Sequence, residues 1–396
     1  MSEWKEVRLG DVCTDLSDGL HKAPLFVEGG DYIFVNAKNL CNGSIVDNDP
    51  TKKTTYEEYL KYSKPLNENT ILFSIDGTIG NIARYKGEKC VLGKGACYIN
   101  PNPVLADSSY IYFQLQSPHF NSYLNCMSTG STIKHISLKT MRNYEFTLPP
   151  LSEQCRISSI LSSLDDKIAV NRRICENLEA QAQALFKHWF IDFAPFKDGK
   201  FVESELGMIP EGWRVGTLGE ICSYSKKKIA ISQLTNKSYY STENMLPNKA
   251  GAIEASSLPQ VEMTTGCLPY DVLVSNIRPY FKKIVRVETT CGCSTDVLCF
   301  HPVDSKYISY MYRVLYNDSF FAYVMSGAKG TKMPRGDKQQ IMKYPIVIPN
   351  DHVLEEYSNF VESMFELISS SKKEIQTLST LRDTLLPRLM SGQIKV

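Results

Sequence analysis

The chain has 396 residues, of which 43% are hydrophobic and 22% are charged. This composition excludes wholesale disorder, and at roughly 100–200 residues per domain the length allows two to four domains. Its apolar runs are shorter than the ~18 residues of a membrane span, and its charged N-terminus lacks the apolar core of a signal peptide, so we expect a cytoplasmic protein without membrane contact. Forty-four basic and 43 acidic side chains give a net charge of +1, which argues against nucleic-acid binding by the whole surface but not by local basic patches.

The first segment, residues 1–150, has the pattern of a mixed α/β domain. Short β-rich runs such as Tyr32-Ile33-Phe34-Val35 and Ile71-Leu72-Phe73 are separated by turn signals such as Asn42-Gly43. Asp76-Gly77-Thr78-Ile79-Gly80 is glycine-rich. A lone glycine pattern of this kind is a weak signal for a ligand, and we interpret it as a turn.

A long helix is predicted over residues 151–194. Its apolar residues recur at alternating steps of four and three, which is the pattern of a coiled-coil seam. A double proline precedes the helix, Ser152 is its expected N-cap, and Phe193-Ala194-Pro195 closes it. The predicted seam residues of this helix are Leu161, Leu164, Ile168, Asn171, Leu178 and Leu185.

Residues 195–350 contain a polar linker, up to Trp213, and a second mixed domain that repeats the first. Short motifs recur in the same order about 200 residues later. For example, Leu9-Gly10-Asp11-Val12-Cys13 matches Leu218-Gly219-Glu220-Ile221-Cys222. A second heptad helix is predicted over residues 351–396. Its predicted seam residues are Val361, Met364, Ile368, Ser371, Leu378 and Leu385.

We expect the two heptad helices to pair, because one helix alone cannot bury its seam. Helices that belong to two-fold-related repeats pair antiparallel, with Asn171 and Ser371 as a polar layer. Roughly 38 residues at 1.5 Å each give a rod of about 57 Å, the length of about 17 base pairs. The alternative is that each helix packs only on its own domain. The expected fold class is α+β, with two pseudo-symmetric α/β domains joined by two long antiparallel coiled-coil helices.

The motifs of common enzyme classes are missing. The chain has no G-x-x-x-x-G-K-[ST] phosphate loop, no H-E-x-x-H and no G-x-S-x-G. Leu148 and Leu151 stand where the N/D-P-P-Y/F loop of an amino-methyltransferase needs a polar and an aromatic residue. The 12 cysteines include no C-x-x-C and the six histidines lie far apart, so we expect buried thiols and no metal site. The sequence therefore favours binding over catalysis.

Basic clusters fall in matching parts of the two repeats, interleaved with tyrosines and small polar residues. Lysine and arginine neutralise phosphates, and arginine, asparagine and serine read base edges. A solvated surface is the alternative for any single cluster, but their recurrence beside Gly-Thr and Gly-Ser turns favours DNA. The candidate DNA-binding residues are Ser74, Asn81, Arg84, Lys94, Thr132 and Lys134 in the first domain and Ser275, Asn276, Arg278, Lys282, Lys332 and Arg335 in the second.

Four motifs make the chain resemble the specificity (S) subunits of type I restriction–modification systems. They are Pro149-Pro150-Leu151-Ser152-Glu153-Gln154, Leu185-Phe186-Lys187-His188-Trp189-Phe190-Ile191-Asp192-Phe193, Ser204-Glu205-Leu206-Gly207-Met208-Ile209-Pro210-Glu211-Gly212-Trp213 and Leu385-Leu386-Pro387-Arg388-Leu389-Met390-Ser391-Gly392. With the tandem layout, they cover the whole chain. The second repeat departs from the first, because Asn350-Asp351-His352-Val353 stands where Pro150-Leu151-Ser152-Glu153 is expected.

The resemblance implies two target-recognition domains that read the halves of a bipartite double-stranded DNA sequence, with the helices as spacer. It implies docking of two methyltransferase (modification) subunits and two restriction (translocase/nuclease) subunits. S-adenosylmethionine, ATP and Mg²⁺ then belong to those partners, and we expect no cofactor, metal or catalytic residue in this chain. Two alternatives stay open: a stand-alone DNA methyltransferase or nuclease, and a coiled-coil assembly protein without DNA contact.

Overall fold

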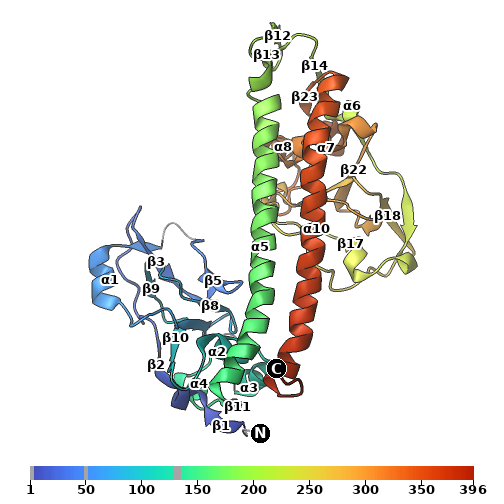
Figure 1. Cartoon of the computed structure of the whole chain (residues 1–396). Coiled ribbons are helices and arrows are strands. Elements are labelled where there is room, and N and C mark those ends of the chain that lie inside the picture. The colour runs from blue at the N-terminus through green and yellow to red at the C-terminus, as the bar shows by residue number, and fades with distance from the viewer. Residues whose placement is uncertain (1–3, 49–51, 128–134) are drawn as a thin grey trace. The chain divides into compact units, whose positions relative to one another are not determined.

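The computed structural model describes residues 4–48, 52–127 and 135–396. The chain divides into two compact units. Unit 1 comprises Met1–Val170 and Glu374–Val396, and unit 2 comprises Asn171–Lys373. Two helices of 40 residues each, α5 (Leu151–Phe190) and α10 (Asp351–Met390), contribute a length to both units (Figure 1).

The mixed domain of unit 1 is built on an antiparallel four-stranded sheet in the order β2-β10-β7-β8. These strands are Cys13–Asp18, Ala96–Pro101, Ile71–Ser74 and Ile82–Arg84. The other strands are β1 (Lys5–Arg8) with β11 (Glu145–Leu148), β4 (Leu40–Cys41) with β5 (Ser44–Ile45), and the sheet β6-β3-β9 (Lys53–Thr54, Tyr32–Val35, Cys90–Leu92). Its helices are α1 (Tyr56–Tyr62), α2 (Ser108–Gln114), α3 (Pro118–Met127) and α4 (Leu138–Arg142).

Unit 2 repeats this architecture. Its central antiparallel sheet has the equivalent order β15-β22-β19-β20, with strands Cys222–Tyr224, Val297–Pro302, Val272–Ser275 and Ile284–Arg286. The other strands are β12 (Phe201–Ser204) with β13 (Gly207–Pro210), β14 (Arg214–Thr217) with β23 (Pro345–Ile348), and the sheet β16-β18-β21-β17 (Lys228–Ala230, Met263–Cys267, Cys291–Cys293, Tyr239–Tyr240). Its helices are α6 (Leu218–Ile221), α7 (Ile308–Tyr316), α8 (Asp318–Ser326) and α9 (Lys338–Met342).

The two long helices start differently. Helix α5 begins at Leu151, and the carbonyl of Pro150 accepts the Glu153 amide at 2.9 Å. Ser152 is exposed within the first turn, so its predicted role as N-cap is wrong: the helix starts two residues too early for it. Helix α10 has a side-chain cap, because Asn350 Oδ1 accepts a backbone amide of the first turn at 3.0 Å. An asparagine cap thus replaces the proline-based start of the first repeat.

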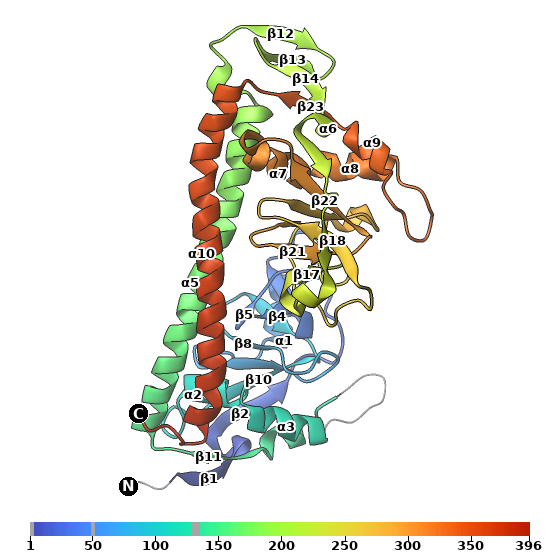
Figure 2. The same ribbon diagram turned by 90° about the vertical axis from the view of Figure 1, so that its right-hand side faces the viewer.

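The lengths of α5 and α10 that share a unit lie side by side and antiparallel (Figures 1 and 2). In unit 1, Arg382 of α10 binds Asp165 of α5 at 2.8 Å. In unit 2, the Cys175 thiol of α5 donates to the Ile368 carbonyl of α10 at 3.7 Å. The residue numbers of the α10 partners decrease as the residue numbers along α5 increase, as an antiparallel pair requires. The predicted fold class, two α/β domains with two long antiparallel helices, is confirmed.

Every predicted seam residue is buried or half-buried, including the polar pair Asn171 and Ser371. The helices also complete the domain cores. Leu161 and Leu389 belong to the hydrophobic core of unit 1, and Val361 belongs to that of unit 2. Each helix therefore pairs with the other and also covers a domain, so the alternative that each helix packs only on its own domain is wrong.

Candidate nucleic-acid interface

Three loops meet at the end of the central sheet in each unit. In unit 1, the amide of Ile75, just after β7, donates to the carbonyl of Gly95 at 3.1 Å, and the amide of Ile136 donates to the carbonyl of Ile75 at 2.9 Å. Ile75, the first residue after β7, thus joins the turn before β10 to the segment before α4. We call this feature the three-loop edge: residues 75–80, 93–95 and 135–137 in unit 1.

The same edge recurs in unit 2, at residues 276–282, 294–296 and 334–337. The amide of Asn276, just after β19, donates to the carbonyl of Asp296 at 2.8 Å, and the amide of Gly336 donates to the carbonyl of Asn276 at 3.3 Å. The two edges share their hydrogen-bond pattern although their side chains differ. The two units thus place different side chains on the same backbone frame.

Ser74 and Asn81 hold the unit 1 edge together from inside. Ser74 is fully buried, and its hydroxyl accepts the Asn81 amide at 2.8 Å. The side-chain amide of Asn81 donates to the carbonyl of Ala37 at 2.8 Å. The prediction that Ser74 touches DNA is wrong, because no solvent reaches it, and Asn81 already uses its amide within the domain.

Lys94 lies on the exposed side of the same edge. Its ammonium approaches Asp76 Oδ2 at 3.8 Å, and half of its side chain is exposed. Asp76 Oδ1 also pairs with the imidazole Nδ1 of His135 at 3.1 Å. The cation is therefore held at the edge and still faces solvent. Thr132 and Lys134, the other two predicted contacts, lie outside the described residues.

Arg84 does not lie with the other candidates. Its guanidinium stacks over the Tyr112 ring, 4.2 Å from the centroid, and donates to Ser162 of α5 at 3.3 Å. Its counterpart in unit 2, Arg286, binds Glu362 of α10 through two bonds of 2.9 and 3.1 Å. The contact of Arg84 with DNA stays a prediction, although its guanidinium is already used within unit 1. The Arg84 guanidinium links the end of β8 to a long helix.

Ser275 and Asn276 take the buried positions of the unit 2 edge. The Ser275 hydroxyl donates to the Ile277 carbonyl at 3.1 Å, and both predicted residues are buried. The predicted DNA contact is wrong for Ser275, because its hydroxyl is used and covered. Asn276 is 7% exposed, so it is largely closed to DNA as well, although its Oδ1 has no partner among the described residues.

The remaining predicted cations of unit 2 lie on or beside its edge. The backbone amide of Arg278 donates to the Pro334 carbonyl at 2.8 Å, which places it next to Arg335. The Arg335 guanidinium pairs with Asp296 at 3.1 Å and is 58% exposed. Lys282 follows four residues after Arg278, and Lys332 is exposed on the segment before Arg335. Their contact with DNA stays a prediction.

Sequence reasoning missed the anions of the two edges. Asp76 and Asp296 hold Lys94 and Arg335, and His135 completes the unit 1 group. A search for cations gives no weight to the carboxylates that orient them. Position was a signal for two of them, because Asp76 lies between the predicted Ser74 and Asn81, and His135 follows the predicted Lys134 directly. Asp296 carried no such signal.

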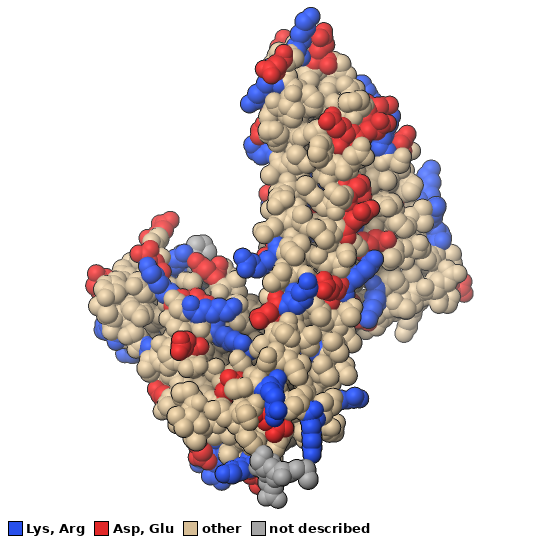
Figure 3. Space-filling model, viewed as in Figure 1, with Lys and Arg blue, Asp and Glu red and all other residues tan. Residues whose placement is uncertain are grey.

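The surface carries no single basic field on the face drawn in Figure 3. There, lysine and arginine are interspersed with aspartate and glutamate in both units. On that face, a phosphate contact must therefore come from local groups of cations.

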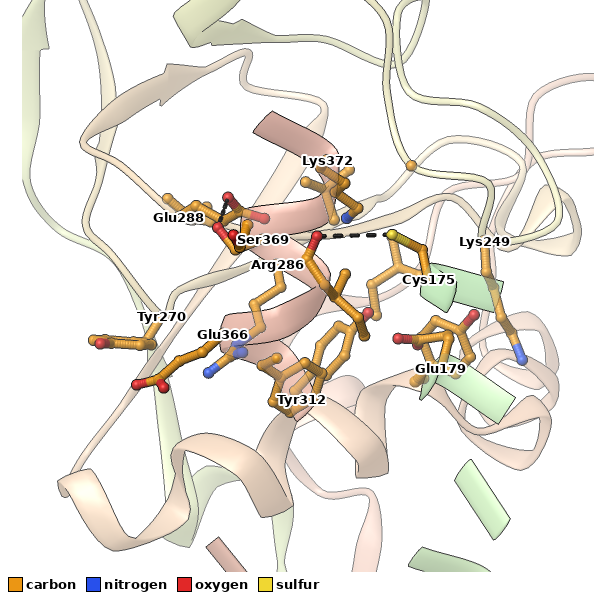
Figure 4. A pocket seen from close by; sticks show the side chains of 18 of the residues that line it. Cys175, Glu179, Lys249, Tyr270, Arg286, Glu288, Tyr312, Glu366, Ser369 and Lys372 are labelled. Carbon is orange, nitrogen blue, oxygen red and sulfur yellow. Dashed lines mark hydrogen bonds between the residues drawn. The ribbon is translucent and has the colours of Figure 1, made fainter. Parts of the chain in front are cut away.

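A cavity of about 560 Å³ in unit 2 lies where β20 meets α5, α7 and α10 (Figure 4). Arg286 on its wall is bound by Glu362, and the Ser369 hydroxyl donates to Glu288 at 2.7 Å. A further lining residue, Glu179, binds the buried Arg313 at 2.9 Å. These pairs join the mixed domain to the long helices, so we assign the cavity a structural role.

Several thiols of the described chain are buried. Burial raises the pKa of Cys90 and of Cys97 to about 12. Within residues 4–48, 52–127 and 135–396, no group of three or more His, Cys, Asp or Glu is placed to hold a metal ion. Among the helices of that same part, none combines the length and apolarity of a membrane span.

Comparison with known proteins gives consistent relatives. A sequence model of the family described as type I restriction modification DNA specificity domain matches residues 1–180. The chain is 28% identical to the type I restriction enzyme MjaIX specificity subunit of Methanocaldococcus jannaschii, over 93% of this chain and 88% of that one. It is 23% identical to the HindI specificity subunit of Haemophilus influenzae, over 100% of both chains. The crystal structure of a type I restriction–modification S subunit from M. genitalium shares the fold, with a TM-score of 0.59 over 98% of this chain and 96% of that one, at 17% identity.

Proposed function

We propose that the chain is a type I restriction–modification specificity subunit, as its relatives are, and that its two units read the two halves of a bipartite double-stranded DNA target. One observation carries this proposal: the three-loop edge, with the same backbone hydrogen bonds, occurs once in each unit. Different side chains on one frame give two readers of different sequence. In unit 1 the reading groups include Lys94, and in unit 2 they include Arg278 and Arg335.

The chain acts as a scaffold without a catalytic site of its own in this proposal. Two methyltransferase subunits and two restriction subunits bind it and bring S-adenosylmethionine, ATP and Mg²⁺. The missing phosphate loop and methyltransferase loop support this division of labour. Methyl transfer to DNA, or its cleavage, by the purified chain alone would contradict it and favour a stand-alone enzyme.

The test is to map methylated adenines in the host genome with and without the gene for this chain. We expect one split motif, with two specified halves around an unspecified spacer, to lose its methylation when the gene is removed. An unchanged set of motifs, in cells where the chain co-purifies with its methyltransferase subunit, would contradict the proposal. The alternative of a coiled-coil protein without DNA contact makes a different prediction. Removing the chain from the complex would then leave the salt-dependent DNA binding of the other subunits unchanged.

A further inference from the structure

Backbone strain is concentrated beside the unit 2 edge. Among the described residues, seven that are not glycine have a positive φ, and four of them meet at one loop. Arg278 and Lys282 bound this loop, with φ of 49° and 50°. The amides of Asn248 and Lys249, the other two, donate to the carbonyls of Phe281 and Lys282 at 2.7 and 2.9 Å. Strain of this kind persists only where the surroundings enforce it, and it collects at functional sites.

Unit 1 builds the equivalent loop without this strain. There, Gly77 and Gly80 have φ of 71° and 99° and occupy the places of Arg278 and Lys282 after the central strand. Glycine adopts a positive φ without steric cost, whereas arginine and lysine adopt it only at a steric cost. Unit 2 therefore carries two long cationic side chains at positions where glycine would cause less backbone strain. This indicates that the two side chains have a function.

The strained loop displays two aromatic rings. Tyr280 and Phe281 have ring centroids 4.6 Å apart and are 47% and 38% exposed. Cations surround them: Arg278 and Lys282 on either side along the chain, and the Lys283 ammonium 5.9 Å from the Phe281 ring. Exposed rings among cations match the chemistry of nucleic acid, where bases stack on rings and phosphates pair with cations.

Contacts at both ends fix the loop in place. The Arg278 amide is bound to Pro334, in the segment that carries the exposed Arg335. At the other end, Asp318 Oδ1 receives the ammonium groups of Lys249 at 2.7 Å and Lys282 at 3.1 Å. The rings are thus presented by a pre-organised loop, next to the predicted reading residues.

We propose that the loop from Arg278 to Lys282 is a DNA wedge, which presses Tyr280 and Phe281 against a base step in the half-site read by unit 2. Arg278 and Lys282 hold the flanking phosphates. The loop of unit 1, with Thr78 and Ile79, lacks the rings and has no such wedge. This inference rests on the proposed function and adds that the two readers work differently, with deformability of the DNA contributing on the unit 2 side.

The test uses the complex of the full chain with its methyltransferase subunit and a duplex that carries the mapped motif. The fluorescent base 2-aminopurine is placed in turn at positions of each half-site other than the methylated adenine. Unstacking raises its fluorescence, so binding should brighten one step in the unit 2 half-site. The double variant Tyr280→Ala/Phe281→Ala should abolish this rise and weaken binding by roughly tenfold to a hundredfold.

Two further variants separate a DNA role from a structural one. The matched control Thr78→Ala/Ile79→Ala in the unit 1 loop should leave the fluorescence at the unit 2 half-site unchanged. Arg278→Gly/Lys282→Gly relieves the strain, so it should unfold at no lower a urea concentration than wild type and yet bind DNA more weakly. A loop that serves folding alone would keep its DNA affinity in this variant.

Unchanged affinity and fluorescence in the Tyr280→Ala/Phe281→Ala complex would overturn the wedge while wild-type binding still supports the proposed function. Loss of the methyltransferase subunit from that variant would also overturn it, since the rings would then form a protein-docking surface. Failure of the wild-type complex to bind DNA selectively at all would instead refute the proposed function.

Discussion

Arg313 of α7 is the largest fully buried side chain of the described chain. Its guanidinium binds Glu179 of α5 at 2.9 and 3.4 Å and lies 5.0–5.4 Å from the ring centroids of Tyr312, Tyr316 and Phe365. A buried cation of this kind is stable only while its partner is present. The residue therefore fastens the mixed domain of unit 2 to both long helices.

Glu179→Ala should lower the free energy of unfolding of unit 2 by about 3 kcal/mol, because it leaves the Arg313 charge buried without a counterion. Urea unfolding, followed by the fluorescence of Trp189 and Trp213 in unit 2, measures this change. Glu176→Ala, on an exposed side chain one turn away, is the control and should shift the value by no more than about 0.5 kcal/mol. If both substitutions lowered the free energy of unfolding equally, the ion pair between Glu179 and Arg313 would not be a specific source of stability.

Lys332→Ala should weaken DNA binding for all sequences alike, because we expect the exposed Lys332 to contact phosphate and not base edges. The slope of log affinity against log salt for the complex should become shallower by about 1. Lys200→Ala removes an exposed lysine of the linker and should leave the slope as it was. If the two variants have the same slope, Lys332 is not a phosphate contact.

The identity of a residue predicted its chemistry but not its exposure. Ser74 and Ser275 are predicted to form hydrogen bonds with DNA, and both form hydrogen bonds inside the protein. Arg84 is predicted to act as a cation, and its guanidinium donates to Ser162 of α5. Burial depends on which distant segments cover a residue, so a single sequence could not separate the two buried serines from the exposed Lys94 and Arg335.

At the scale of elements, the helix seam divides neighbouring residues into buried and exposed. Leu161 is fully buried in the core of unit 1, whereas the adjacent Ile160 is 37% exposed. Leu161→Ala should reduce the free energy of unfolding by about 2–5 kcal/mol, and Ile160→Ala by about 0.5 kcal/mol or less. Urea unfolding followed by circular dichroism at 222 nm compares them. A larger loss for Ile160→Ala would contradict the assigned seam.

The long helices could be predicted closely because a heptad pattern is local in sequence. Helices α5 and α10 begin at Leu151 and Asp351, within the expected regions. The strand order β2-β10-β7-β8 could not be predicted, because β10 pairs with strands on both sides that are far from it in sequence. The three-loop edge depends on that strand order. The spatial arrangement of its loops therefore could not be predicted from the sequence either, although the internal repeat indicated which loops were involved.

For the whole molecule, continuous helices link two readers, and we expect their length to set the DNA spacer. Inserting one heptad after Val170 in α5 and another after Lys373 in α10 keeps the seam in phase at the boundary between the units. Each insertion adds about 10 Å of helix. The methylated motif should keep both half-sites and gain a longer spacer.

The matched control inserts the same seven residues between Glu205 and Leu206, in the turn of the β12–β13 hairpin. Its spacer should equal that of wild type. If the variant with both helix insertions kept its methylation and an unchanged spacer, the length of the helices would not set the spacer.

The most direct test of two separate readers is a chain that carries the first reader twice. Residues 214–348, from β14 to β23, are replaced by residues 5–148, from β1 to β11, which are bounded by the equivalent strand pair. Methylation mapping then gives the motif of the complex with its methyltransferase subunit. We predict a motif with the unit 1 half-site on both sides of the spacer, because both readers then have the same residues. A motif that still contains the unit 2 half-site would contradict the account.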